Sequence, residues 1–149
     1  MNCTPFLLFD GNCAEAMAFY QACLGGELTM LRLGDTPMGE QAEPEQRDKI
    51  TYAHLVSGGL DISATDWLHP TRVPRPGNTV AVYVRADDVD ELRGAFSGLA
   101  VGADEKLLDD LREMPFGTYG HLADRYGVHW FFRGPSPDGD DLSRGDEDD

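Results

Sequence analysis

Residues 5–33 read PFLLFDGNCAEAMAFYQACLGGELTMLRL, a pattern that predicts a strand, a helix and a second strand in direct succession. Residues 5–10 form a short apolar run typical of a strand. Asn12 is a natural N-cap with Glu15 in the capping-box position, and apolar side chains at helical spacing follow. Glycine accepts the left-handed conformation that ends helices, so we expect the helix to end at Gly25 and Gly26.

The remainder of the first half predicts two more strands. Residues 34–48 are polar and contain prolines, which is typical of an exposed loop. Residues 50–56 and 60–64 flank Gly58 and Gly59, a pattern that predicts a hairpin with a tight turn. The first half therefore reads β-α-β-β-β, and the proline-rich residues 69–78 form a connector.

The same pattern restarts at residues 80–100, VAVYVRADDVDELRGAFSGLA. Alternating valines predict a strand, and Asp88 caps a helix with Glu91 in the capping-box position. Residues 107–114 are interpreted as extended, and residues 119–123 and 128–133 flank a four-residue turn from Asp124 to Gly127. Two β-α-β-β-β modules indicate an α+β fold built on a structural repeat.

Length and charge limit the function. The chain has 149 residues, which suits one domain over residues 1–133, with modules at about 1–68 and 78–133. Residues 134–149 carry seven acids and one arginine, which predicts a disordered acidic tail. The net charge of −15 and only twelve scattered Lys and Arg argue against nucleic-acid and anionic membrane partners.

Cysteine usage and hydropathy predict a cytoplasmic protein. Cys3, Cys13 and Cys23 show no C-x-x-C spacing and predict neither a zinc cage nor a disulfide framework. No stretch approaches the roughly 20 apolar residues that a membrane span needs.

Three stretches resemble one known family. They are LLFDGNCAEAMAFYQACLGGEL at 7–28, ITYAHLVSGGLDISATDW at 50–67 and DRYGVHWFF at 124–132. Together they are similar to the PhnB-like branch of the vicinal oxygen chelate superfamily of glyoxalases, bleomycin-resistance proteins and dioxygenases. The resemblance implies paired βαβββ modules that form a cupped mixed sheet around a ligand cavity, usually in a homodimer.

The resemblance also implies where metal-dependent relatives hold their metal. Those positions fall on Pro5, on Ala81 (or Thr79, two residues earlier) and on Phe131. Proline, alanine and phenylalanine have no side-chain donor atom, so we expect no metal and no other cofactor. The alternative is a relocated ligand set drawn from His54, Asp61, His121 and His129. Some relatives carry a demethylubiquinone methyltransferase label, but no glycine-rich loop for an adenosyl cofactor follows a parallel strand here.

Strand alternation selects the residues that share the cavity face. If Pro5, Ala81 and Phe131 mark this face, it also carries Leu7, Phe9, Tyr83, Arg85 and His129, while Val80, Val82, Val84, Trp130 and Phe132 face the helices. Tyr52 and His54 share one face of their strand, and the sequence leaves open which face that is. The predicted ligand-binding residues are Tyr52, His54, Tyr83, Arg85, His129, Phe9 and Phe131.

Each candidate has a plain structural alternative. Tyr83 and Arg85 suit an anionic head group, but Arg85 could equally pair with a surface acid. His129 could act as an acid or base, or make a structural hydrogen bond. The aromatic residues bordering loops could line a ligand mouth or only pack: Trp67, Phe116, Tyr119 and His121. Cys13 at a helix start could have a lowered thiol pKa.

The sequence therefore predicts a PhnB-like protein that binds an unidentified small molecule in an aromatic cavity without the usual divalent metal. Whether it is an enzyme stays open; if it is, the resemblance implies a lyase- or transferase-like member of unknown substrate. The alternative is a resistance protein of bleomycin-resistance type that traps a cationic drug without catalysis, which the acidic charge favours.

Overall fold

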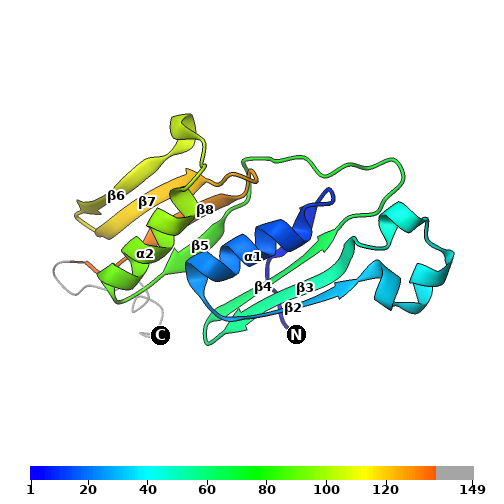
Figure 1. The fold of residues 1–149 in the computed structure, drawn as a ribbon. Helices are drawn as coiled ribbons and strands as arrows, with labels where there is room; N and C mark the ends of the chain where they lie inside the picture. Colours follow the sequence, from blue (N-terminus) through cyan, green and yellow to red (C-terminus); the bar gives the residue numbers. More distant parts are fainter. Residues whose placement is uncertain (137–149) are drawn as a thin grey trace. The chain divides into compact units, whose positions relative to one another are not determined.

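A computed structural model describes residues 1–136 and divides the chain into two compact units. The first unit is Met1–Arg75, and the second begins at Pro76, inside the predicted connector. The predicted acidic tail lies outside the described residues from position 137 onward. Each unit has the predicted β-α-β-β-β order (Figure 1). None of the helices in residues 1–136 combines the length and the hydropathy that a membrane span requires.

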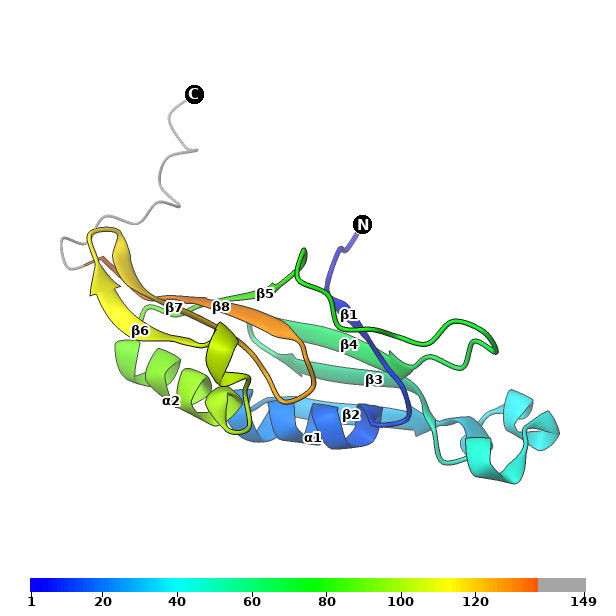
Figure 2. The same ribbon diagram turned by 90° about the horizontal axis from the view of Figure 1, so that it is seen from above.

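The first unit is a four-stranded mixed sheet with the order β1-β4-β3-β2, in which β1 runs parallel to β4. Helix α1 packs against β2, β3 and β4 (Figure 2). Three short 3-10 helices, η1–η3, replace the predicted loop between β2 and β3. The strands and helix are β1 (Phe6–Phe9), α1 (Cys13–Leu24), β2 (Glu27–Arg32), β3 (Ile50–Ser57) and β4 (Leu60–Asp66), and the 3-10 helices are Leu33–Asp35, Pro37–Gln41 and Pro44–Gln46.

The start of α1 is held by a carboxylate from the sheet. Asn12 occupies the N-cap position but makes no side-chain cap hydrogen bond, contrary to the prediction. Instead the backbone N–H of Cys13 donates to Oδ1 of Asp66 at 2.9 Å, and that of Ile50 donates to Oδ2 at 2.8 Å. Asp66 is 3% exposed, so one buried carboxylate ties α1 to β3 and β4.

Burial shows which face of the first sheet α1 covers. Ala53 and Leu55 are fully buried, so the alternating Tyr52 and His54 lie on the open face. Phe9 is 4% exposed and pairs with Asp66, which contacts the start of α1. The expectation that Phe9 lines an open face is therefore wrong. Phe6 and Leu8 of β1 point to that face, and the alternating Phe9 points away from it.

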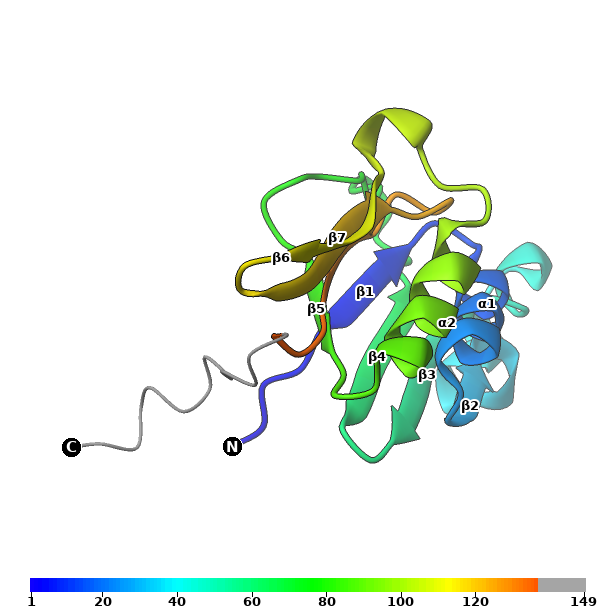
Figure 3. The same ribbon diagram turned by 90° about the vertical axis from the view of Figure 1, so that its left-hand side faces the viewer.

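The second unit repeats this topology, with the sheet order β5-β8-β7-β6 and β5 parallel to β8. Helix α2 packs against β7 and β8 (Figure 3). Its predicted cap is confirmed, since Oδ1 of Asp88 accepts from the Asp90 N–H at 2.9 Å. The elements are β5 (Val82–Arg85), α2 (Val89–Ala100), η4 (Glu105–Leu107), β6 (Asp109–Met114), β7 (Gly117–Ala123) and β8 (His129–Arg133).

The core of the second unit lies between the sheet and α2. Trp130 and Phe132 are fully buried, as alternation predicts, and the Phe132 ring meets Phe96 of α2 edge-on at 5.0 Å. Val80 is an exception: it precedes the strand and is 82% exposed. The prediction that it faces the helix is wrong, because β5 begins only at Val82.

Candidate functional site

A row of four side chains crosses the open face of the second sheet. The strand registers pair Tyr83 with Phe131, Phe131 with His121, and His121 with Asp109, so one residue comes from each of β5, β8, β7 and β6. Register partners share a face, and the neighbouring Trp130 and Phe132 are buried on the opposite one. We call Tyr83, Phe131 and His121 the aromatic row.

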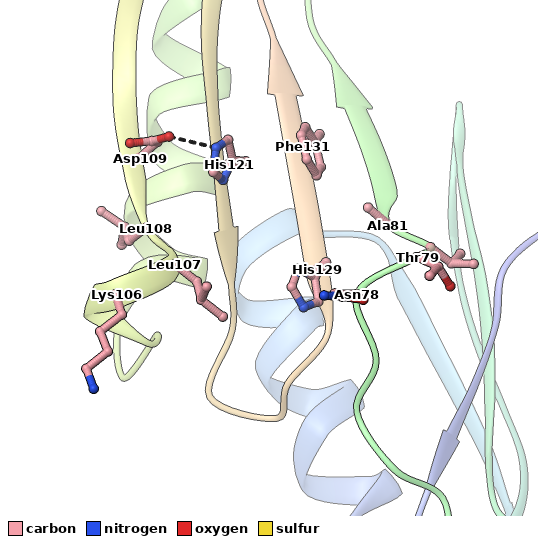
Figure 4. A pocket seen from close by; sticks show the side chains of 11 residues that line it. Asn78, Thr79, Ala81, Lys106, Leu107, Leu108, Asp109, His121, His129 and Phe131 are labelled. Carbon is pink, nitrogen blue, oxygen red and sulfur yellow. Dashed lines mark ion pairs between the residues drawn. The ribbon is translucent and has the colours of Figure 1, made fainter.

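A pocket of about 390 Å³, within the range of small-molecule sites, lies beside Phe131, His121 and Asp109 of this row. The backbone segments that line it are residues 78–81, before β5, and residues 106–109, at the start of β6. His121, His129 and Phe131 complete its wall (Figure 4). We call it the second-module pocket.

Ring contacts fix the aromatic part of this wall. The His121 ring stacks on Phe131 with centroids 5.0 Å apart and an interplanar angle of 27°. Tyr119 lies 6.2 Å from Phe131 and 6.0 Å from His121. A planar ligand could continue this stack, because the row faces away from α2.

A histidine–aspartate pair ends the row. Nε2 of His121 lies 2.7 Å from Oδ2 of Asp109, and the two side chains are 30% and 51% exposed (Figure 4). Within the first unit His54 of β3 also pairs with an aspartate, Asp61 of β4, at 2.8 Å. The hydroxyl groups of Tyr52 and Ser63 lie 3.4 Å apart beside it.

Two arginines lie next to the aromatic row, two residues further along their strands. Arg85 on β5 and Arg133 on β8 are register partners. The Arg85 guanidinium lies 5.9 Å from the centre of the Tyr83 ring, and that of Arg133 lies 5.0 Å from the centre of the Phe116 ring. Arg133 also donates to the Phe116 carbonyl at 2.8 Å. Within residues 1–136 neither arginine of this arginine pair forms an ion pair with a carboxylate.

The structure brings some of the predicted ligand-binding residues together and separates others. Tyr83, Arg85, His129 and Phe131 share the open face of the second sheet, as alternation predicts. Tyr52 and His54 share the open face of the first unit, and Phe9 lies in its core. Asp109, Lys106 and Arg133 were not predicted as site residues. His121 was predicted only as an aromatic residue bordering a loop and as one of the alternative metal ligands.

Two alternative chemistries receive little support from the described part of the chain. Within neither unit do three or more His, Cys, Asp and Glu side chains of the described residues form a group that could hold a metal ion. Cys13 is fully buried, and its burial and the charge of Asp66 raise its thiol pKa to about 12. The hypothesis that Cys13 has a lowered pKa is therefore wrong.

A family model and the solved structure of another protein each match most of this chain. The family model for 3-demethylubiquinone-9 3-methyltransferase matches residues 1–132. Protein PA1353 from Pseudomonas aeruginosa is 31% identical, with a TM-score of 0.77 over 90% of this chain and 97% of its own.

More distant solved structures share the fold. The PhnB protein of Bacillus cereus, described as a 3-demethylubiquinone-9 3-methyltransferase, is 23% identical with a TM-score of 0.67, over 90% of this chain and 99% of its own. A glyoxylase/bleomycin resistance protein/dioxygenase domain from Frankia sp. EAN1pec is 18% identical with a TM-score of 0.59, over 90% of this chain and 91% of its own. The predicted resemblance and the vicinal oxygen chelate fold of two modules are thereby confirmed.

Proposed function

The chain belongs to the 3-demethylubiquinone-9 3-methyltransferase family, and we propose that within its vicinal oxygen chelate fold it binds a small aromatic anion on the open face of its second module. The aromatic row supplies a surface for a planar group, with the second-module pocket on its His129 side and the arginine pair on the other side. The homodimer and the cytoplasmic location stay predictions.

The arginine pair is the observation that carries this proposal. Two cations held side by side on paired strands repel each other, and no carboxylate of the described chain neutralises them. A carboxylate, phosphate or phosphonate could accept hydrogen bonds from both guanidinium groups. Two residues of strand separate the arginine pair from Tyr83 and Phe131, about 7 Å, which matches the length of a small aromatic acid.

The methyl transfer in the family's description requires an adenosyl cofactor, and the described residues do not fit one at a strand–helix turn. The turn before α1 contains a single glycine, Gly11, and the backbone N–H of Cys13 at the start of α1 already donates to Asp66. The turn before α2 has no glycine, and Asp88 caps that helix. Such cofactors usually need a glycine-rich turn with free N–H groups at the helix start, so we propose no methyl transfer.

Two probes of similar size and opposite charge test the proposal. Phenylphosphonate should raise the melting temperature of the full chain, and benzylammonium should not. A ligand at 100 times its Kd stabilises the folded state by about 2.7 kcal/mol through mass action. Calorimetry should give saturable binding of phenylphosphonate with one site per chain.

Charge-removing variants locate the site. The double substitution Arg85→Gln and Arg133→Gln should weaken phenylphosphonate binding by a factor of about 10 or more, because hydrogen bonds to charged groups contribute roughly 1.5–3 kcal/mol each. Arg93→Gln, on the exposed side of α2, is the matched control and should leave the affinity unchanged. Stabilisation by benzylammonium or a basic glycopeptide, with none by phenylphosphonate, would instead support drug sequestration.

A further inference from the structure

We propose that His121 is a general base in the second-module pocket and that Asp109 positions it. This inference rests on one premise of the proposed function, which is that a small molecule binds at the second-module pocket. The ligand class is a compound with an acidic C–H or O–H group that reaches the pocket wall beside Phe131. The protein would then be an enzyme of proton transfer rather than a binding protein alone.

The close contact between Nε2 of His121 and Oδ2 of Asp109 indicates which ring nitrogen is basic. An ionised carboxylate only accepts hydrogen bonds, so Nε2 of the neutral ring, 2.7 Å from Oδ2 of Asp109, carries the proton. Nδ1 then holds the lone pair. No described residue donates a hydrogen bond to Nδ1, and the side chain is 30% exposed, so a pocket ligand can reach it.

The surroundings hold the His121 ring in one orientation. Its strand β7 pairs with β6 at Asp109 and with β8 at Phe131, so the carboxylate and the stacking ring flank it on neighbouring strands. The 5.0 Å stack on Phe131 and the Tyr119 ring at 6.0 Å restrict rotation of the imidazole. Figure 4 shows His121 between Asp109 and Phe131 on the pocket wall. Such preorganisation is what an effective base requires.

The other histidines lack this combination. Nδ1 of His69 already accepts from the backbone N–H groups of Thr71 and Arg72 at 3.1 and 3.0 Å. His54 has Asp61 beside it, but Ser63 takes the register position that Phe131 holds beside His121. His129 lines the same pocket without a carboxylate partner among residues 1–136.

The chemical step is a single proton transfer. The acidic C–H or O–H bond of the ligand breaks, the proton moves to Nδ1 of His121, and the electron pair stays on the ligand. The imidazolium that forms is stabilised by the charge of the Asp109 carboxylate, whose Oδ2 lies 2.7 Å from Nε2. Return of the proton to the ligand or to water restores the neutral ring.

The elimination reaction of 5-nitrobenzisoxazole tests this step directly, because it needs only a base and a planar site. The base removes the C3 proton, the C–H electrons form the nitrile, and the N–O bond breaks to give a coloured phenolate. The wild-type chain should accelerate the reaction by about 100-fold or more over the same concentration of free imidazole. The probe is neutral, so its turnover does not depend on the arginine pair.

Three variants assign the roles. His121→Gln should abolish the acceleration. Asp109→Asn should lower kcat by about 10-fold with little change in KM, and Asp109→Glu should recover part of the loss, which a purely structural role would not predict. His69→Gln is the matched control and should react like the wild type.

Two results would overturn the inference: a wild-type rate no higher than that of imidazole, or an acceleration that survives in His121→Gln. Phenylphosphonate titration of His121→Gln separates this failure from failure of the proposed function. If that variant binds the anion but the wild type does not accelerate elimination, only the general base is wrong. If elimination depends on His121 but no anion binds, only the anionic ligand class is wrong.

Discussion

The indole N–H of Trp130 donates a 2.8 Å hydrogen bond to Oδ2 of Asp124 inside the second unit. The two side chains are 0% and 3% exposed. Oδ1 of the same carboxylate accepts from the backbone N–H groups of Tyr126 at 2.8 Å and Val128 at 3.1 Å. One buried carboxylate therefore holds both the turn between β7 and β8 and the core tryptophan.

Replacing Asp124 by Ala should lower the free energy of unfolding by about 3 kcal/mol, because it leaves three buried or half-buried N–H donors without this acceptor. Urea denaturation followed by tryptophan fluorescence measures the change. Asp110→Ala, at an exposed position of β6, is the control and should cost less than about 0.5 kcal/mol. Equal effects of the two substitutions would contradict the assigned role of Asp124.

The sequence was sufficient for the features that depend on local pattern. Alternation separates Trp130 and Phe132, which are buried, from His129 and Phe131, which line the pocket. It could also have placed His121, because a turn from Asp124 to Gly127 sets this residue opposite Phe131 across the hairpin. Applying the hairpin register would have moved His121 from a loop neighbour to the pocket wall.

Other features depend on contacts that local pattern does not encode. Alternation shows that Leu7 and Phe9 share a face, but the burial of that face under α1 follows from tertiary packing. The partner of His121 depends on the register between β6 and β7, which is shifted between Asp109 and Arg112. The Asp66 carboxylate displaces Asn12 as the cap although it lies 53 residues from Cys13.

Cys13 should make the stability of the protein fall at alkaline pH. Burial and the nearby Asp66 raise its pKa from 9.0 to about 12, so the folded state keeps the thiol protonated where the unfolded state loses the proton. The stabilising effect of this group is complete below pH 9 and is lost as the pH rises from 9 to 12, at about 1.4 kcal/mol per pH unit. Urea denaturation at about pH 8 and pH 10.5 measures the loss.

Cys13→Ala removes this titration and should show a smaller loss of stability between the two pH values than the wild type. Cys3→Ala is the control, because Cys3 is exposed, and its pH dependence should match the wild type. A thiol reagent should modify Cys3 in the folded protein and leave Cys13 unmodified. Rapid native-state labelling of Cys13 would show that its environment is open to solvent.

If the protein works without a divalent metal, treatment with a chelator should change neither its stability nor its ligand binding. The described side chains contain no group of three metal-ligating residues, and the His54 and His121 pairs each bring one imidazole and one carboxylate. Dialysis against EDTA should therefore alter neither the melting temperature nor the affinity for phenylphosphonate. Stoichiometric zinc, nickel or iron in protein purified without chelator, lost together with stability on dialysis, would establish the relocated ligand set.

Phe131 should contribute to ligand binding through the face of its ring and not only through its volume. It stacks on His121 and lies at the centre of the aromatic row. Phe131→Leu keeps an apolar side chain but removes the aromatic face, and an aromatic pair contributes about 0.5–1.5 kcal/mol beyond buried area. Phenylphosphonate binding should weaken by roughly 2- to 10-fold, while binding of the saturated analogue cyclohexylphosphonate should change little.

Calorimetric titration of both ligands into wild type, Phe131→Leu and Phe19→Leu measures this difference. Phe19 lies on α1 in the other unit, so its substitution should leave the ratio of the two affinities unchanged. Equal losses for both ligands in Phe131→Leu would mean that Phe131 acts by volume alone. An unchanged affinity for both would place the bound ring away from the aromatic row, because a ligand stacked on Phe131 cannot be insensitive to the loss of its ring.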